Sequence, residues 1–338
     1  MRLRRSLFAL MVVVAAVALE GHSTLSPFER IDRELRSIST RLGTTAVALE
    51  VWQHGRPLRS RRYGPDGLVN AGSGRKAVTA AVVMSLVEDG LVELDEGISL
   101  PGWGHARFTM RQLLSHTAGL PDKPARGACQ GVESLAACTE AAGVATFQIY
   151  DPGAAFSYSS LGYQLAARHA EVASGQMWSE LVDERILGPL EMVATTHRMA
   201  GAGLTEMDGQ LMTTPTDYAR FLQMLLDEGM YRGTRILERS SVRALEADQL
   251  DVAGRKRVSG RLKWHKSHPP YGLGLWRIAV DEAGSARISG TEGRGGFRGW
   301  VDRDNDVVGV LAVSRPGNVS IRVGALAKWV ALAVEPRL

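Results

Sequence analysis

The sequence contains few cysteines, few lysines and few aromatic residues. Only two of its 338 residues are cysteine, and six of its 40 basic residues are lysine. Cys129 and Cys138 have no histidine nearby at a spacing typical of zinc ligands, and neither has a neighbouring base that could activate a thiol. We therefore expect no metal site, no catalytic cysteine and no bound cofactor. Internal repeats and low-complexity linkers are also missing from the sequence, which favours one integrated module.

Excess charge of one sign is scarce as well. The formal net charge is +4, and Arg2, Arg4 and Arg5 supply three of those charges, so the rest of the chain is close to neutral. A near-neutral chain lacks the strongly basic balance that is typical of nucleic-acid-binding domains. We expect no nucleic-acid partner.

The N-terminal segment has the pattern of an export signal. Three arginines precede an uncharged run of 13 residues, Leu7–Leu19, which contains the small-residue sequence Ala16-Val17-Ala18. A helix of this length spans about 20 Å, which is shorter than the roughly 30 Å hydrocarbon core of a membrane. Residues 1–25 are therefore predicted to be a signal peptide, with an uncleaved anchor through residues 7–19 as the alternative. Either interpretation places the rest of the chain in the periplasm or outside the cell.

Export has a consequence for the two cysteines. Cys129 and Cys138 are nine positions apart in a segment rich in glycine and alanine. Exported proteins meet an oxidising environment, in which paired cysteines commonly form disulfides. We expect a disulfide between Cys129 and Cys138.

Predicted strands lie at both ends of the chain, and predicted helices lie between them. A hairpin over residues 45–63 follows a helix over residues 28–42. The expected central helices are Met110–Ser115, Leu161–Ser174, Trp178–Leu187, Pro215–Glu228 and Arg239–Asp248. The expected C-terminal elements are the strands Tyr271–Val280, Ala286–Ser289, Phe297–Asp302 and Asp306–Ser314, and the helix Ile321–Val334. This order predicts an α+β fold in which both chain ends build one antiparallel sheet that is flanked by helices.

The same layout predicts how the domain is organised. One domain is expected over residues 26–338, with an α/β lobe formed by about 26–105 and 268–338. A mostly helical lobe, about 106–267, is expected as an insertion between these two parts.

A serine three residues before a lysine, Ser73-Gly-Arg-Lys76, precedes an uncharged stretch from Ala77 to Val87 that ends near Gly90. A helix that is apolar nearly all round is a buried one. Residues at i and i+3 lie on the same helix face, so the Lys76 amine is expected to reach the Ser73 hydroxyl. Burial lowers the pKa of a lysine, and a neutral amine can act as a base toward a nucleophilic hydroxyl.

This motif also has an ordinary interpretation. Serine is a common residue at the start of a helix, and S-x-x-K occurs by chance in many sequences. However, only one of the six lysines, Lys76, has a serine three residues before it. The abundant arginines could serve a surface role equally well, but arginine does not give up its proton.

Several segments resemble signatures of the serine β-lactamase-like superfamily, which includes class C β-lactamases, penicillin-binding proteins, related esterases and D-aminoacyl peptidases. The first is Phe108-Thr-Met-Arg-Gln-Leu-Leu-Ser-His-Thr-Ala-Gly-Leu-Pro121. It is followed in the family's order by Phe156-Ser-Tyr-Ser-Ser-Leu-Gly-Tyr163, Arg185-Ile-Leu-Gly-Pro-Leu-Glu-Met192, Thr214–Leu226 and Tyr271-Gly-Leu-Gly-Leu-Trp276. The resemblance extends over about residues 28 to 335, and it implies the fold described above.

The resemblance also implies roles for particular residues. Ser73 matches the nucleophile and Lys76 the lysine of the S-x-x-K motif. Tyr158 matches the catalytic tyrosine of the Y-x-N motif, but Ser160 stands where asparagine is usual. A serine hydroxyl can still bind a lysine or a substrate carbonyl, although it makes fewer hydrogen bonds. His116 matches a histidine of the LLSHTAGL stretch, and the resemblance implies a structural role for it.

The third motif of the family departs most from the pattern. Gly290-Thr291-Glu292 stands where K-T-G or H-x-G is usual, and Gly293 follows it. The resemblance implies that Thr291 and Ser160 bind substrate, and that the N–H groups of Ser73 and Gly293 hold the oxyanion. The missing cation should weaken recognition of the carboxylate that β-lactams and peptidoglycan stems carry. Arg294 is expected to be solvated, and the alternative is that it replaces the missing cation.

The expected function is therefore an exported serine hydrolase that cleaves a small ester or amide through an acyl-enzyme on Ser73. A class C-like β-lactamase or a D-alanyl carboxypeptidase is the alternative within enzymes. The alternative outside enzymes is a catalytically weak or inactive protein that recognises penicillin, because Ser160 and the third motif are altered.

Overall fold

The computed structural model describes residues 26–41, 47–64, 67–103, 108–122, 129, 132–198, 210–250, 271–293, 296–313 and 328–334. The predicted signal peptide and the predicted boundary between the lobes near residue 267 lie outside these ranges. Among the helices within them, none is both long enough and apolar enough to span a bilayer.

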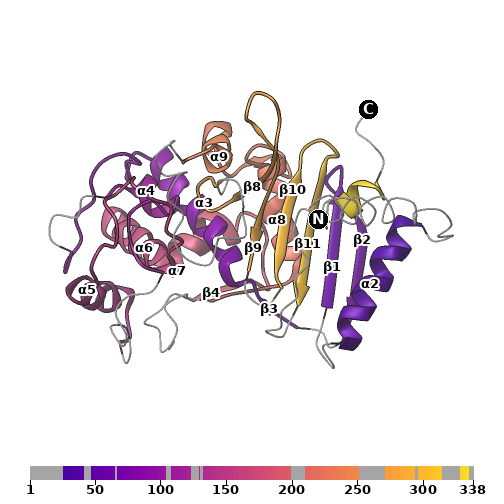
Figure 1. Ribbon diagram of the computed structural model, residues 1–338, viewed down its shortest axis with the longest axis horizontal. Helices are drawn as coiled ribbons and strands as arrows, with labels where there is room; N and C mark the ends of the chain where they lie inside the picture. Colours follow the sequence, from indigo (N-terminus) through magenta and orange to yellow (C-terminus); the bar gives the residue numbers. More distant parts are fainter. Residues whose placement is uncertain are drawn as a thin grey trace, which may run out of the picture.

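Strands from the two ends of the chain meet in one six-stranded sheet (Figure 1). Its spatial order is β2-β1-β11-β10-β9-β8, and every neighbouring pair is antiparallel. The strands are β1 (Val47–Gln53), β2 (Arg56–Tyr63), β8 (Trp276–Val280), β9 (Ala286–Glu292), β10 (Arg298–Asp302) and β11 (Val307–Val313). The first strand thus pairs with the last, and the predicted α+β architecture is confirmed.

The prediction missed several short strands. These are β3 (Val69–Asn70), β4 (Thr196–Arg198), β5 (Gln210–Thr213), β6 (Met230–Tyr231) and β7 (Thr234–Arg235). Strands of two to four residues are too short to display a hydrophobic period. The predicted strand Tyr271–Val280 begins only at Trp276, because Gly274 has a φ of +81° and turns the chain before it.

The central helices agree with the predicted ones to within a few residues. The helices are α2 (Pro27–Arg41), α3 (Arg75–Glu88), α4 (Met110–Leu114), α5 (Leu135–Ala145), α6 (Ser160–Ser174), α7 (Trp178–Val182), α8 (Pro215–Leu226) and α9 (Arg239–Glu246). A π-helical turn, Asp183–Leu187, continues α7. Of the predicted C-terminal helix, residues 328–331 are helical in the described part of the chain.

Within the described part of the chain, α5 is a helix that the prediction missed. Its glycine- and alanine-rich sequence has almost no apolar periodicity, although Ser134 caps its first turn by accepting a hydrogen bond from the N–H of Ala137. This helix carries Cys138, which forms the expected disulfide with Cys129.

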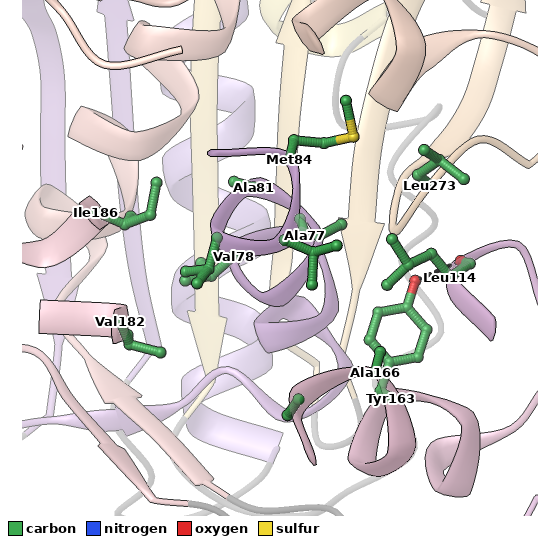
Figure 2. Packing of buried hydrophobic residues seen from close by; sticks show 14 of the residues in the cluster. Ala77, Val78, Ala81, Met84, Leu114, Tyr163, Ala166, Val182, Ile186 and Leu273 are labelled. Atoms are coloured by element: carbon green, nitrogen blue, oxygen red, sulfur yellow. Dashed lines mark hydrogen bonds between the residues drawn. The ribbon is translucent and has the colours of Figure 1, made fainter. Parts of the chain in front are cut away.

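Helix α3 lies at the centre of the main hydrophobic core. All residues from Arg75 to Leu86 are buried, which confirms the expectation for an uncharged helix. Its small side chains allow close approach of α6, α7 and α9. Ala77, Val78, Ala81 and Met84 belong to the same core as Leu114, Tyr163, Ala166, Val182, Ile186 and Leu273 (Figure 2). The helix ends at Glu88, and Gly90 then adopts a φ of +70°, as is common after a helix.

Alternate residues of the strands face two different cores. On one face, Val47, Leu49 and Trp300 pack with Ile31 and Leu35 of α2. On the other face, side chains of β10 and β11 join the main core, which also contains α8. The sheet is therefore covered on both sides, and its middle strands are buried.

The close packing of β10 on β11 gives a test of this core. A Cβ atom on Gly309 would lie 2.0 Å from Cζ2 of Trp300, whose side chain is fully buried. We expect Gly309→Ala to lower the free energy of unfolding by about 1–3 kcal/mol, the usual cost of overpacking. Urea unfolding of the purified chain measures this difference.

Gly97→Ala is the matched control, because a Cβ at Gly97 meets no atom within 4 Å. Its stability should stay within about 0.5 kcal/mol of the parent. Equal stabilities of the two variants would mean that Trp300 does not pack against Gly309 in solution.

Candidate active site

Ser73 lies in a 3₁₀ turn, Gly72–Gly74, that leads directly into α3. Asn70 holds the start of this turn, because its side-chain oxygen accepts a hydrogen bond from the N–H of Gly72 at 2.8 Å. Ser73 is half-buried, whereas the side chain of Lys76 is buried. The Nζ atom of Lys76 lies 3.4 Å from the Ser73 Oγ atom. This distance is at the long end of the hydrogen-bond range.

Ser160 contacts the same amine. Its Oγ atom lies 3.4 Å from Lys76 Nζ, so two hydroxyls lie within hydrogen-bond distance of the amine. Ser160 is the first residue of α6, and Ser159 caps that helix by accepting a hydrogen bond from the N–H of Gly162 at 3.0 Å. The Ser160 hydroxyl also donates to the Asp122 carboxylate at 3.2 Å. The structure thus brings Lys76, Ser73 and Ser160 together as the sequence predicts.

The Tyr158 ring lies against the same amine. Its centroid is 4.8 Å from Lys76 Nζ, and the ring of Tyr163 is 5.4 Å away on another side. The indole of Trp276, the first residue of β8, stacks parallel to the Tyr158 ring with centroids 6.1 Å apart. Aromatic faces attract a cation and exclude water, so Lys76 occupies a largely dry site in which the hydroxyls of Ser73 and Ser160 are polar neighbours.

Hydrogen bonds fix the segment that carries Tyr158. Ser157 donates its N–H to the carbonyl of His116 at 2.8 Å, and Ser159 donates its N–H to the His116 Nδ1 atom at 2.9 Å. The hydroxyl of Ser159 donates to the carbonyl of Pro121 at 2.7 Å. These bonds hold residues 157–160 beside residues 116–122, on both sides of Tyr158.

His116 is the centre of this arrangement. Burial, and secondarily the positive charge of Lys76, hold the pKa of His116 well below its usual range. A neutral ring can accept at Nδ1, as the bond from Ser159 requires. The rings of Phe156, Tyr158, Tyr163 and Tyr271 surround it with centroids 4.1–5.6 Å away. This environment agrees with the structural role expected for His116.

The third motif lies beside the turn that carries Ser73, but the backbone N–H of Gly293 has a different partner from the one expected. The N–H of Gly293 donates to the carbonyl of Phe297 at 2.8 Å within the hairpin of β9 and β10. The N–H is therefore engaged, and this corrects the predicted oxyanion role of Gly293. A Cβ at this position would lie 2.1 Å from the carbonyl oxygen of Ala71. Glycine is needed here because the hairpin packs directly on the turn that carries Ser73.

Thr291 also differs from the expectation. Its side chain is buried, and its Oγ1 atom lies 3.3 Å from the hydroxyl of Tyr218. That hydroxyl donates to the carbonyl of Gly74 at 2.8 Å. Thr291 thus supports the Ser73 turn through Tyr218 of α8, and its buried hydroxyl is engaged in this contact.

Sequence reasoning missed Asp122 and Tyr218, and it gave Trp276 no role. Tyr218 and Trp276 stand in segments that resemble the family, and Asp122 directly follows one of them. The sequence does not show which distant residues meet in space, and each of these three side chains contacts a residue of the site that is more than 35 positions away. No group of histidine, cysteine and acidic side chains suited to a metal ion occurs among the described residues.

Comparisons with known proteins agree with this geometry. Penicillin-binding protein 4 of Amycolatopsis lactamdurans is 30% identical over 52% of this chain, a match that spans only 55% of that protein. The D-alanyl-D-alanine-carboxypeptidase/endopeptidase AmpH of Escherichia coli (strain K12) is 24% identical over 87% of both chains. The crystal structure of a putative beta-lactamase from Bacteroides dorei superposes with a TM-score of 0.76 at 28% identity, covering 90% of this chain and 98% of that one.

A family model gives the broadest match. The model described as Beta-lactamase matches residues 31–333, which include Ser73, Lys76, Tyr158 and the whole six-stranded sheet. The chain belongs to the Beta-lactamase family.

Proposed function

We propose that the protein is an exported serine hydrolase that cleaves a small ester or amide through an acyl-enzyme on Ser73. The observation that carries this proposal is the buried amine of Lys76, 3.4 Å from the Ser73 hydroxyl and 4.8 Å from the centroid of the Tyr158 ring. Membership of a family that contains hydrolases supports it. The reaction needs no redox step, since it only transfers an acyl group between oxygen or nitrogen nucleophiles.

In the first step, Lys76 together with Tyr158 takes the proton of Ser73. The Ser73 oxygen then forms a bond to the substrate carbonyl carbon, and the resulting oxyanion is held by backbone N–H groups that include that of Ser73. Tyr158 protonates the leaving alcohol or amine as its bond to the carbonyl breaks. In the second step, water attacks the acyl-enzyme and releases the acid. Lys76 and Tyr158 are assigned the base role jointly, because coupled groups titrate as a pair.

The preference for esters and neutral amides rests on the third motif. It has neither lysine nor histidine, and Thr291 is buried. Arg298 on the neighbouring strand donates Nη1 to the carbonyls of Gly293 and Phe297, so this guanidinium holds the hairpin together. A substrate that depends on a cation for its carboxylate therefore gains less here than in relatives with the usual motif.

Export is part of the proposal. The basic start, the short apolar run Leu7–Leu19 and the disulfide between Cys129 and Cys138 favour an oxidising compartment outside the cytoplasm. A membrane tether through residues 7–19 and the two-lobed organisation of residues 26–338 stay predictions.

A D-alanyl carboxypeptidase is the second candidate. The AmpH match, which covers 87% of both chains, favours it. The two functions differ in the group that the site must recognise, because only the peptidase substrate ends in a free carboxylate.

Ser73→Ala tests the proposed function directly. We expect the parent chain to hydrolyse p-nitrophenyl butyrate and the variant to lose about a thousandfold or more of kcat/KM, because no nucleophile remains. Ser85→Ala, on the same helix, is the control and should keep the parent rate. Turnover that survives in Ser73→Ala would disprove the acyl-enzyme.

Lys76→Arg separates a base from a mere positive charge. Guanidinium does not accept the serine proton near neutral pH, so kcat/KM for the same ester should fall about 100-fold or more. Lys328→Arg, a lysine on an exposed helical segment, should leave the rate unchanged. Full activity of Lys76→Arg would remove Lys76 from the mechanism.

A substrate panel distinguishes the candidates. We expect faster turnover of p-nitrophenyl butyrate than of nitrocefin or of a peptide ending in D-Ala-D-Ala. Fast release of D-alanine would favour the carboxypeptidase, and fast nitrocefin turnover would favour a β-lactamase. Stable labelling by a fluorescent penicillin without turnover of any substrate would mean that the protein only recognises its ligand.

A further inference from the structure

Asp122 and Lys76 both lie within hydrogen-bond distance of the Ser160 hydroxyl. The Asp122 Oδ1 atom is 3.2 Å from the Ser160 Oγ atom and 3.3 Å from the Ser160 backbone nitrogen. The carbonyl of Asp122 accepts the same N–H at 3.0 Å, which fixes the residue against the start of α6. The Ser160 Oγ atom is also 3.4 Å from Lys76 Nζ. The three polar groups Asp122, Ser160 and Lys76 thus form a series of hydrogen bonds that ends at Ser73.

The chemistry of these groups determines which atom donates and which accepts in each of these hydrogen bonds. An ionised carboxylate only accepts hydrogen bonds, whereas a hydroxyl has one proton to donate and two lone pairs. The Ser160 proton therefore goes to Asp122, and only a lone pair of Ser160 faces Lys76. When Lys76 has given up its proton and acts as the base, the neutral amine donates an N–H to Ser160, and its unshared electron pair is directed elsewhere.

We propose that Asp122 is a positioning residue for the reaction at Ser73. Its carboxylate turns the Ser160 hydroxyl away from Lys76, so the unshared electron pair of the amine stays available for the Ser73 proton. Without an acceptor at position 122, the Ser160 hydroxyl can rotate and donate to that electron pair, which slows proton transfer from Ser73. The inference rests on the function proposed above.

The substitution at position 160 explains why such a group is needed. The family pattern has asparagine there, and an amide presents its carbonyl and its NH₂ at fixed places. A hydroxyl rotates about its C–O bond, so its direction depends on a neighbour. Asp122 supplies that neighbour within hydrogen-bond distance of both the hydroxyl and the backbone N–H of Ser160.

A purely structural role of Asp122 predicts different behaviour. A carboxylate at the first turn of α6 stabilises the helix through its dipole and its free N–H groups. In that case, removing the carboxylate lowers stability and acts on the rate in the same way whether or not Ser160 has a hydroxyl. The positioning role instead makes the loss of rate depend on that hydroxyl.

The test is a double-mutant cycle on the full chain, with kcat/KM for p-nitrophenyl butyrate as the measured quantity. Asp122→Ala should lower kcat/KM about tenfold, the size of one misdirected hydrogen bond to a reacting group. Asp122→Asn should stay within about threefold of the parent, because its amide oxygen still accepts from Ser160. The decisive result is rescue: adding Ser160→Ala to Asp122→Ala should bring the rate to that of Ser160→Ala alone.

Controls separate the possible failures. Asp304→Ala removes an exposed carboxylate from the turn between β10 and β11, and this variant should keep the parent rate. Thermal unfolding is followed for every variant, and Asp122→Leu, which has a similar branched shape but no hydrogen-bond acceptor, replaces Asp122→Ala if that variant does not fold. A parent rate in Asp122→Ala, or an equal tenfold loss with and without the Ser160 hydroxyl, would overturn the inference alone. A parent chain without Ser73-dependent turnover would overturn the proposed function and this inference together.

Discussion

The burial of one lysine amine is the constraint on which the rest of the site depends. Lys76 is almost fully enclosed, and a buried amine is tolerated only where polar partners and aromatic faces compensate for lost water. Here the hydroxyls of Ser73 and Ser160 and the rings of Tyr158 and Tyr163 provide that environment. Helix α3 makes the burial possible, since its small apolar residues let neighbouring helices close around it (Figure 2).

The partners of the amine come from distant parts of the chain, so the fold must hold them rigidly. Residues 157–160 are fastened to residues 116–122 by hydrogen bonds to His116 and Pro121. From the sheet, Gly293 packs on the carbonyl of Ala71, and Tyr218 binds the carbonyl of Gly74. The turn that carries Ser73 is thus supported on both sides by groups with no chemical role of their own.

The departures from the family pattern have different structural consequences. At position 160 the hydroxyl still lies within reach of Lys76, and Asp122 accompanies it. In the third motif the side chains stabilise the hairpin of β9 and β10: Thr291 is buried, and Arg298 joins the two strands. The hydroxyl of Ser73 thus stays close to the Lys76 amine, whereas the third motif has neither lysine nor histidine.

The sequence by itself determined the fold class, the order of the main helices and strands, the disulfide and the neighbourhood of Ser73 and Lys76. These follow from local periodicity, from composition and from a three-residue spacing that fixes two side chains on one helix. Only the tertiary structure decided the roles of four other residues, which are Gly293, Thr291, Asp122 and Tyr218. Which way a strand presents its N–H groups, and which side chains from distant segments meet, depends on pairing register and packing, and a single sequence carries no local signal for either.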